Sequence, residues 1–181
     1  ANTFESGEGT RFFTGLVNGQ PTWGSSESAA RPVLVDNPLK TPSYAPSVGN
    51  VSVIFSNELG LWLMTYDSNG GKSQNAAGFY FAYAPEPWGP WSEPQLIFNA
   101  RRDGALGSFI HDPRIVPNPP GDGLNGPTIG PNDPATTPGA PYAPYMIERF
   151  TRVNGDRLSI YYTLSTWNPY TIVEMRSDFT I

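Results

Sequence analysis

Short runs of aromatic and β-branched residues, separated by turn residues, recur along the whole chain. Apolar runs of this length, bounded by Gly, Pro, Asn and Asp, are typical of β-strands. No segment carries the 3.6-residue apolar period of a long amphipathic helix. The pattern predicts strands at residues 11–16, 31–36, 51–56, 61–67, 78–84, 95–99, 109–116, 143–151, 157–165 and 170–178.

Turn residues between these runs indicate how the strands pair. Asn57-Glu58-Leu59-Gly60 separates two runs, and Asn-Gly pairs occur in Ser68-Asn69-Gly70-Gly71 and Asn154-Gly155-Asp156. Asn-Gly is the strongest short hairpin signal, because both residues tolerate positive φ. Neighbouring strands are therefore expected to pair antiparallel.

Two internal echoes suggest that one structural unit is repeated. Tyr44-Ala45-Pro46 recurs as Tyr142-Ala143-Pro144, and the Trp-Gly pair at Trp23 recurs at Trp88. Each Trp-Gly turn leads into a predicted strand that begins near a Pro. Repeated units of about four strands are typical of β-propeller blades.

The predicted strands can be laid out as blades. Residues 50–99 give one complete blade, residues 143–178 give three strands with the innermost first, and residues 11–36 give the outer two strands of another. Residues 100–141 form a Pro/Gly-rich excursion. A propeller ring needs about four blades or more. We therefore predict an all-β, partial propeller that is completed by a missing N-terminal fragment or by a partner chain.

Composition and charge narrow the class of protein. Aromatic residues make up 13% and charged residues 15%, which excludes a coiled coil and a disordered chain. The net charge of −5 and the absence of a basic stripe argue against nucleic acid as a partner. No apolar run approaches the roughly 20 residues that span a bilayer, so we expect no membrane partner.

The chain contains no cysteine, so disulfides and thiolate metal sites are excluded. Its first residue is Ala1, with no Met and no signal peptide, which predicts a mature or processed product. The tripeptide Asn50-Val51-Ser52 predicts glycosylation of Asn50 if the product is secreted.

Three longer motifs resemble a known family. They are Gly89-Pro90-Trp91-Ser92-Glu93-Pro94, Tyr142-Ala143-Pro144-Tyr145-Met146-Ile147 and, the most distinctive, Tyr161-Tyr162-Thr163-Leu164-Ser165-Thr166-Trp167-Asn168-Pro169-Tyr170. The chain resembles the C-terminal half of the secreted propeller family known as domain of unknown function 4185, over roughly Phe12 to Ser177.

This resemblance implies a five-bladed β-propeller related to glycoside hydrolases, some of which cleave arabinan. It also implies that the main catalytic carboxylates lie in N-terminal blades that have no counterpart here. The expected role is therefore one wall of a substrate cleft for an arabinan-like or other glycan. By analogy alone, a calcium ion on the propeller axis is the one metal to consider.

Glycoside hydrolysis needs two carboxyl groups, about 5–5.5 Å apart for retention and about 6.5–9.5 Å apart for inversion. The candidates are Asp112, which follows the only histidine, and Glu148 on the predicted innermost strand of the last blade. Each has an ordinary structural alternative: Asp112 as a turn former before Pro113, and Glu148 in an ion pair with a neighbouring blade. Glu27 follows a Trp-Gly turn and is interpreted as structural.

Candidates for sugar binding gather in loops expected at one face of the propeller, at residues 67–77, 141–145 and 167–170. Aromatic side chains can stack on sugars, although packing in a core is an equally ordinary role. Asn168, before Pro169, can equally be a turn residue, and His111 a structural histidine. The predicted substrate-binding residues are His111, Tyr142, Tyr145, Arg149, Trp167 and Asn168.

Three functions remain open at this point. The first is the C-terminal part of a secreted glycoside-hydrolase-like propeller, inactive alone. The second is a carbohydrate-binding propeller without catalysis, and the third is a secreted interaction protein whose aromatic residues all serve the core. One histidine and no cysteine cannot build the usual zinc sites, and no resident cofactor is predicted.

Overall fold

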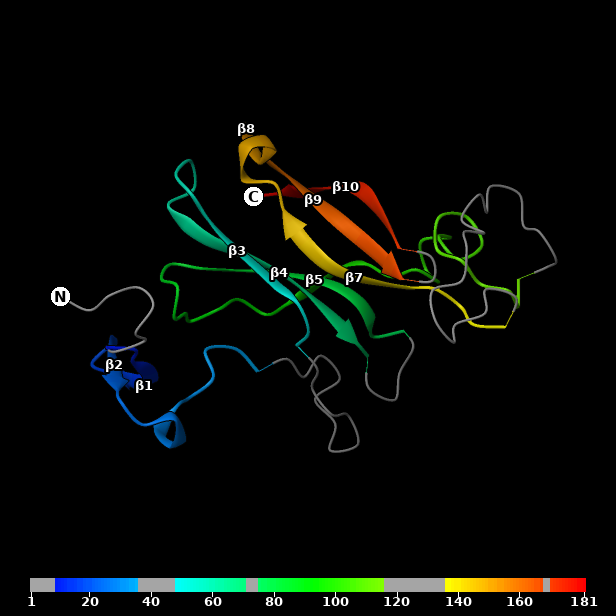
Figure 1. The fold of residues 1–181 in the computed structure, drawn as a ribbon. Coiled ribbons are helices and arrows are strands. Elements are labelled where there is room, and N and C mark those ends of the chain that lie inside the picture. The colour runs from blue at the N-terminus through cyan, green and yellow to red at the C-terminus, as the bar shows by residue number, and fades with distance from the viewer. Residues whose placement is uncertain (1–8, 36–47, 71–74, 116–135, 168–169) are drawn as a thin grey trace.

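The computed structural model describes residues 9–35, 48–70, 75–115, 136–167 and 170–181, and over these residues the chain is all-β (Figure 1). Ten strands form three antiparallel sheets there. The helical segments of this part are two short 3₁₀ turns, η1 (Glu27–Ala29) and η2 (Glu148–Phe150). The predicted all-β fold class is confirmed, and three open antiparallel sheets agree with a partial propeller.

The middle sheet is a four-stranded antiparallel meander in chain order. Its strands are β3 (Val51–Ser56), β4 (Leu61–Asn69), β5 (Ala77–Ala84) and β6 (Gln95–Phe98). Their bounds agree with the prediction to within two residues. Four consecutive strands that lie side by side are the arrangement of a propeller blade.

The C-terminal sheet has the order β7 (Ala140–Met146), β9 (Arg157–Trp167), β10 (Thr171–Thr180). A further short strand, β8 (Arg152–Asn154), also pairs with β9. Since β10 pairs with β9 over the full length from Thr171 to Thr180, β7 and β8 share the other edge of β9. The order of β7, β9 and β10 is that of a second blade with its innermost strand first.

The predicted strand over residues 143–151 is wrong in its second half. After β7, the N–H groups of Phe150 and Thr151 both bond back to the carbonyl of Ile147, at 3.0 and 3.2 Å. Those groups are therefore withdrawn from the ladder with β9, and the chain curls into η2. Glu148 and Arg149 lie in this 3₁₀ turn and not on an innermost strand.

The first sheet is a hairpin of β1 (Phe12–Val17) and β2 (Gln20–Gly24). The turn between them is Asn18-Gly19, with φ values of 52° and 78°. Positive φ at both residues of a two-residue loop defines the type I′ turn that Asn-Gly favours. The second strand of this unit is thus β2, and not the predicted strand at residues 31–36.

Two predicted strands are not formed in the part of the chain that the structure describes. Residues 31–35 contain no strand, and Pro32 lacks an N–H to donate to a ladder. Residues 109–115 contain only an isolated bridge between Ile110 and Leu106. The N–H groups of Phe109 and Ile110 both bond to the carbonyl of Ala105, which closes a local loop instead of a strand.

The main hydrophobic core lies between the middle and C-terminal sheets. Along β9 every second side chain is buried, from Leu158 to Thr166, so one face of this strand points into the core. The fully buried members from the two sheets include Leu63, Phe79, Ile160, Tyr162 and Leu164. Burial of each such side chain contributes about 1.5–3 kcal/mol.

The opposite face of the middle sheet is only partly covered. A smaller cluster forms there around Met64, Tyr66 and Tyr80, and Tyr66 and Tyr80 stack with ring centroids 5.4 Å apart. On the same face β3 exposes Val51 and Phe55, at 45% and 37%, as well as Val53. The apolar edge of β3 is therefore exposed on the face opposite the main core.

Candidate functional site

A cavity of about 560 Å³ lies at one end of the middle and C-terminal sheets. Its walls come from the end of β4, the start of β5, the segment that follows β6, and the start of β7. The lining residues are 67–69, 77–78, 99–101, 106, 112, 114 and 138–142. These include parts of two of the three loops in which the sequence predicted sugar contacts.

Asp67, near the end of β4, ties the two sheets together at the edge of this cavity. Its carboxylate accepts hydrogen bonds from the backbone N–H of Asn50 at 2.7 Å, the side-chain amide of Asn50 at 3.1 Å, and the backbone N–H of Ala143 at 2.9 Å. Three of its roughly four lone-pair positions are thus used by the protein. Asp67 therefore fixes the residue before β3 and the bulged middle of β7 next to the cavity.

A β-bulge in β7 allows this contact. The register with β9 shifts between Tyr142 and Tyr145, and Ala143 has a φ of 55°. The bulge turns the N–H of Ala143 toward Asp67 and the carbonyl of Pro144 toward the hydroxyl of Thr65, which donates to it. Bulges often re-aim side chains next to functional sites.

The bulge separates two tyrosines that the sequence analysis treated alike. Tyr142 lines the cavity, whereas Tyr145 lies beyond the bulge, is 49% exposed and is not among the lining residues. Just after it, the N–H of Met146 donates to Ser52 Oγ at 3.0 Å, which fixes β7 against β3. Of the two tyrosines, only Tyr142 is placed to stack on a sugar in this cavity.

Asp112 lines the cavity and is buried, as the prediction of a site role requires. Arg114 donates to its carboxylate through Nε and Nη2, both at 2.8 Å, and through its backbone N–H at 3.0 Å. These hydrogen bonds lower the pKa of Asp112 from its ordinary value, although burial acts in the opposite direction. An ionised carboxylate with these partners is a poor proton donor and is suited to positioning.

His111 is 5% exposed, and its carbonyl accepts a hydrogen bond from Gly139 N–H at 2.8 Å. This bond joins the segment around His111 to the residue before β7. His111 therefore supports the part of the cavity wall that contains Asp112 and Tyr142. The imidazole is not among the groups that line the cavity. His111, one of the predicted binding residues, therefore lies behind the lining of the cavity and next to Asp112.

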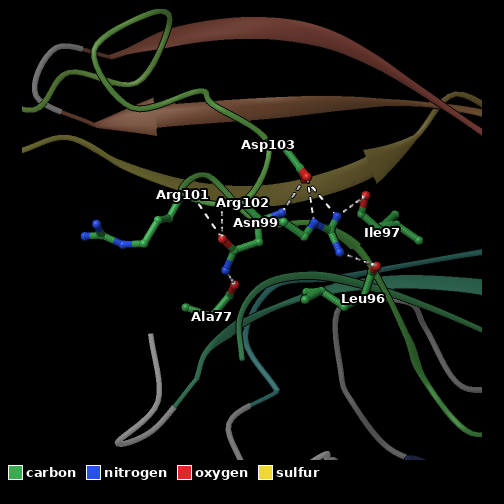
Figure 2. A network of polar contacts seen from close by, with 7 residues as sticks. All are labelled: Ala77, Leu96, Ile97, Asn99, Arg101, Arg102 and Asp103. Atoms are coloured by element: carbon green, nitrogen blue, oxygen red, sulfur yellow. Dashed lines mark hydrogen bonds and ion pairs between the residues drawn. The ribbon is translucent and has the colours of Figure 1, made fainter. Parts of the chain in front are cut away.

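Asn99, directly after β6, organises the part of the cavity wall that residues 99–101 form, and Figure 2 shows its polar contacts. Its side-chain amide donates to the carbonyl of Ala77 at 2.5 Å, and its Oδ1 accepts the N–H groups of Arg101 and Arg102 at 3.1 and 2.7 Å. The backbone N–H of Asn99 donates to Asp103, 2.9 Å away. These bonds fix the turn that carries Arg101 into the cavity.

Arg102 and Asp103 form the fixed part of this turn. Arg102 binds both carboxylate oxygens of Asp103, at 2.6 and 2.8 Å, and also donates to the carbonyls of Leu96 and Ile97 (Figure 2). The hydrogen bonds from Arg102 lower the pKa of Asp103. The charges of Arg102 and Asp103 therefore balance each other within the protein.

The structure does not bring the two predicted catalytic carboxylates together. Asp112 lies at the end of the sheets where β7 starts, and Glu148 follows the other end of β7. The two carboxylates thus lie toward opposite ends of β7, and only Asp112 is among the lining residues of the cavity. Glu148 and Arg149 are not part of the cavity.

The remaining predicted residues lie beside the cavity or outside the described part. Trp167 pairs with Ala140, which lines the cavity, but Trp167 itself is not a lining residue. Asn168 lies outside the described residues. Asn50 is exposed, and its side-chain amide nitrogen donates to Asp67. An N-linked glycan would be attached to that same nitrogen, and glycosylation of Asn50 stays a prediction.

The sequence analysis missed several residues that build the site: Asp67, Asn99, Arg101 and Arg114. Asp67 falls in a loop that was expected at this face, but the Asp-Ser-Asn-Gly pattern reads as an ordinary turn. Arg114 follows Asp112 by two residues, which is a signal for a local ion pair. No signal marks Arg101, since the turn at Asn99 sets its direction.

Within the described residues, no three His, Cys, Asp or Glu side chains gather in a group that could hold a metal ion. The axial calcium that the resemblance suggested stays a prediction. No helix in the described residues is both long and apolar enough for a membrane crossing.

The sheets and the cavity define an all-β protein with the strand order of propeller blades and a cavity at one end of two sheets, lined by both polar and apolar residues. The chain belongs to the family described as Domain of unknown function (DUF4185), whose model matches residues 4–176. This confirms the family that the sequence motifs indicated. None of the curated proteins matches this chain significantly.

Proposed function

We propose that this chain binds carbohydrate in the cavity at the end of the middle and C-terminal sheets. The observation that carries the proposal is the cavity lining, in which carboxylate, amide, guanidinium and tyrosine groups from separate segments converge on one space of about 560 Å³. A volume of this size is typical of small-molecule sites. Fixed polar groups beside an aromatic ring match the hydroxyls and the apolar face of a sugar.

Binding is better supported than catalysis by this chain alone. The carboxylate of Asp112 is held ionised by Arg114, and three N–H groups already bond to Asp67. The ionised Asp112 is not arranged as a proton donor, the oxygens of Asp67 are largely occupied, and Glu148 is remote from both. In this proposal the chain is one wall of the substrate cleft of a secreted, glycoside-hydrolase-like propeller, and the catalytic carboxylates lie on other blades.

The partner in this proposal is a further set of blades, supplied by a preceding fragment or by a second chain. The support is the apolar edge of β3, where Val51, Val53 and Phe55 are exposed on the face opposite the main core. Blade faces in propellers bury apolar side chains against the next blade. Native mass spectrometry of material from the natural source would show a complex with a second chain or a longer polypeptide, and a lone, folded, monomeric chain would contradict this part.

The binding proposal is tested by calorimetric titration with neutral arabino-oligosaccharides. Tyr142→Ala is expected to weaken binding about fivefold or more, because it removes the one aromatic residue among the described lining residues. Tyr145→Ala is the matched control, since the same substitution on the same strand removes a ring outside the cavity. Equal effects of both variants, or no binding by the wild type to any glycan, would contradict the proposal.

Hydrolysis is measured in the same samples as release of reducing ends. No release is expected from the chain alone. Release that disappears in Asp112→Asn would place a catalytic acid in this cavity, which the proposal does not allow.

A further inference from the structure

Three arginines surround the turn after β6 and the cavity wall, and two of them are already paired. Arg102 is bound to Asp103 through two hydrogen bonds and to two backbone carbonyls. Arg114 is bound to Asp112 through two parallel hydrogen bonds. Their charges are balanced by acids of the protein, so neither offers an unpaired cation to a ligand.

Arg101 is different. Its backbone N–H bonds to Asn99, but among the described residues its guanidinium makes no ion pair and no hydrogen bond. Figure 2 shows its side chain directed away from the Asn99–Asp103 network. It is exposed and lines the cavity. Its positive charge is also close enough to Asp112 to favour the ionised form of that carboxyl.

The acceptors of the cavity are meanwhile largely used. The carboxylate of Asp67 takes three N–H groups and that of Asp112 takes three from Arg114. The cavity thus has one guanidinium without an acid partner among the described residues, while the oxygens of its two carboxylates are largely occupied by N–H donors, which in the case of Asp67 are neutral. A ligand that supplies one negative charge at Arg101 would complete the pairing.

We propose that the glycan bound in this cavity is acidic, and that Arg101 binds the carboxylate of a uronic acid residue. The inference rests on the proposed carbohydrate-binding function. A guanidinium presents two parallel N–H groups that match a planar carboxylate. A phosphate or sulfate ester usually gathers more than one cation, and Arg101 is the only unpaired one among the described lining residues.

The test compares two ligands of similar length, tetragalacturonate and a neutral arabino-tetrasaccharide, by calorimetric titration. The wild type is expected to bind the acidic ligand more tightly, and added salt is expected to weaken only that binding. Arg101→Gln should weaken binding of tetragalacturonate by about tenfold or more and leave the neutral ligand unchanged. Arg101→Lys should recover only part of the loss, because an ammonium lacks the parallel donors.

Arg149→Gln is the matched control, because it removes the same charge from η2, outside the cavity. It should leave both affinities unchanged, and a loss equal to that of Arg101→Gln would overturn the inference. Equal binding of acidic and neutral ligands, with no effect of Arg101→Gln, would overturn it while the carbohydrate-binding function stands. No binding of either ligand would refute that function and the inference with it. A sulfated oligosaccharide that binds more tightly than tetragalacturonate would refute the assignment to a carboxylate.

Discussion

The clamp formed by Asp67 gives the most direct test of how the two sheets are held at the cavity. Asp67→Ala removes three hydrogen bonds at once: two from Asn50 and one from Ala143. The bonds to Asn50 are exposed and the bond to Ala143 is partly buried, so each is taken at about 0.7–1 kcal/mol, within the range of an ordinary hydrogen bond and below that for a buried charged acceptor. The free energy of unfolding is expected to fall by about 2–3 kcal/mol.

The assay is urea unfolding, followed by tryptophan fluorescence and circular dichroism. For a chain of this size, that loss corresponds to a fall in Tm of about 4–10 °C. Asp67→Asn should be nearly as damaging, because its amide nitrogen would face N–H donors in place of an acceptor. A largely unchanged m value would show that the variant alters stability and not the compactness of the unfolded chain.

Asp156→Asn is the control for the change of charge. Asp156 is exposed in a turn, and its side chain makes no hydrogen bond or ion pair with another described residue. Its effect should stay within about 0.5 kcal/mol. An equally small effect of Asp67→Ala would refute the clamp, because the three N–H groups would then be satisfied as well by water.

Two further predictions concern the middle sheet and the cavity wall. Gly78→Ala should reduce the free energy of unfolding by several kcal/mol in the same urea assay, because Gly78 has φ 147° and an added Cβ would lie 2.0 Å from the carbonyl oxygen of Phe98. Gly60→Ala is the control, because Gly60 also has positive φ but an added Cβ would meet open space, and it should cost only about 1–2 kcal/mol. Equal costs of the two substitutions would refute the steric argument. Asp112 has a lowered pKa in the fold, so its contribution is present above its ordinary pKa of 3.8 and is lost as the pH falls through the lower folded value. Thermal unfolding should therefore show a smaller acid-induced loss of stability for Asp112→Asn than for the wild type, and parallel curves would contradict the pairing with Arg114.

The strands could be predicted well wherever the apolar pattern and the turn chemistry agreed. β9 alternates without interruption and was found from the sequence, as were the four strands of the middle sheet. The prediction failed at η2, because the bonds from Phe150 and Thr151 back to Ile147 leave no trace in the apolar pattern. It failed at β2 although Asn18-Gly19 carries a recognisable turn signal, which was overlooked.

The location of the cavity could be predicted, but most of its chemistry could not. The loops at the end of β4 and the start of β7 were expected to meet at one face, and Asp112 and Tyr142 do line the cavity there. The separation of Tyr142 from Tyr145 depends on a bulge that is held by Asp67 and Thr65, from a distant part of the chain. The position of Arg101 likewise depends on tertiary hydrogen bonds.

The central claim is that this cavity binds carbohydrate, and NMR with an oligosaccharide tests it most directly. Amide proton and nitrogen shifts would be recorded for the whole chain as tetragalacturonate and the arabino-tetrasaccharide are titrated in turn. The account predicts saturable shifts concentrated at the lining residues around Asp67, Asn99 and Tyr142, with at least one of the two ligands. Shifts confined to the outer surface near Tyr145, or no saturable shift with either ligand, would contradict it.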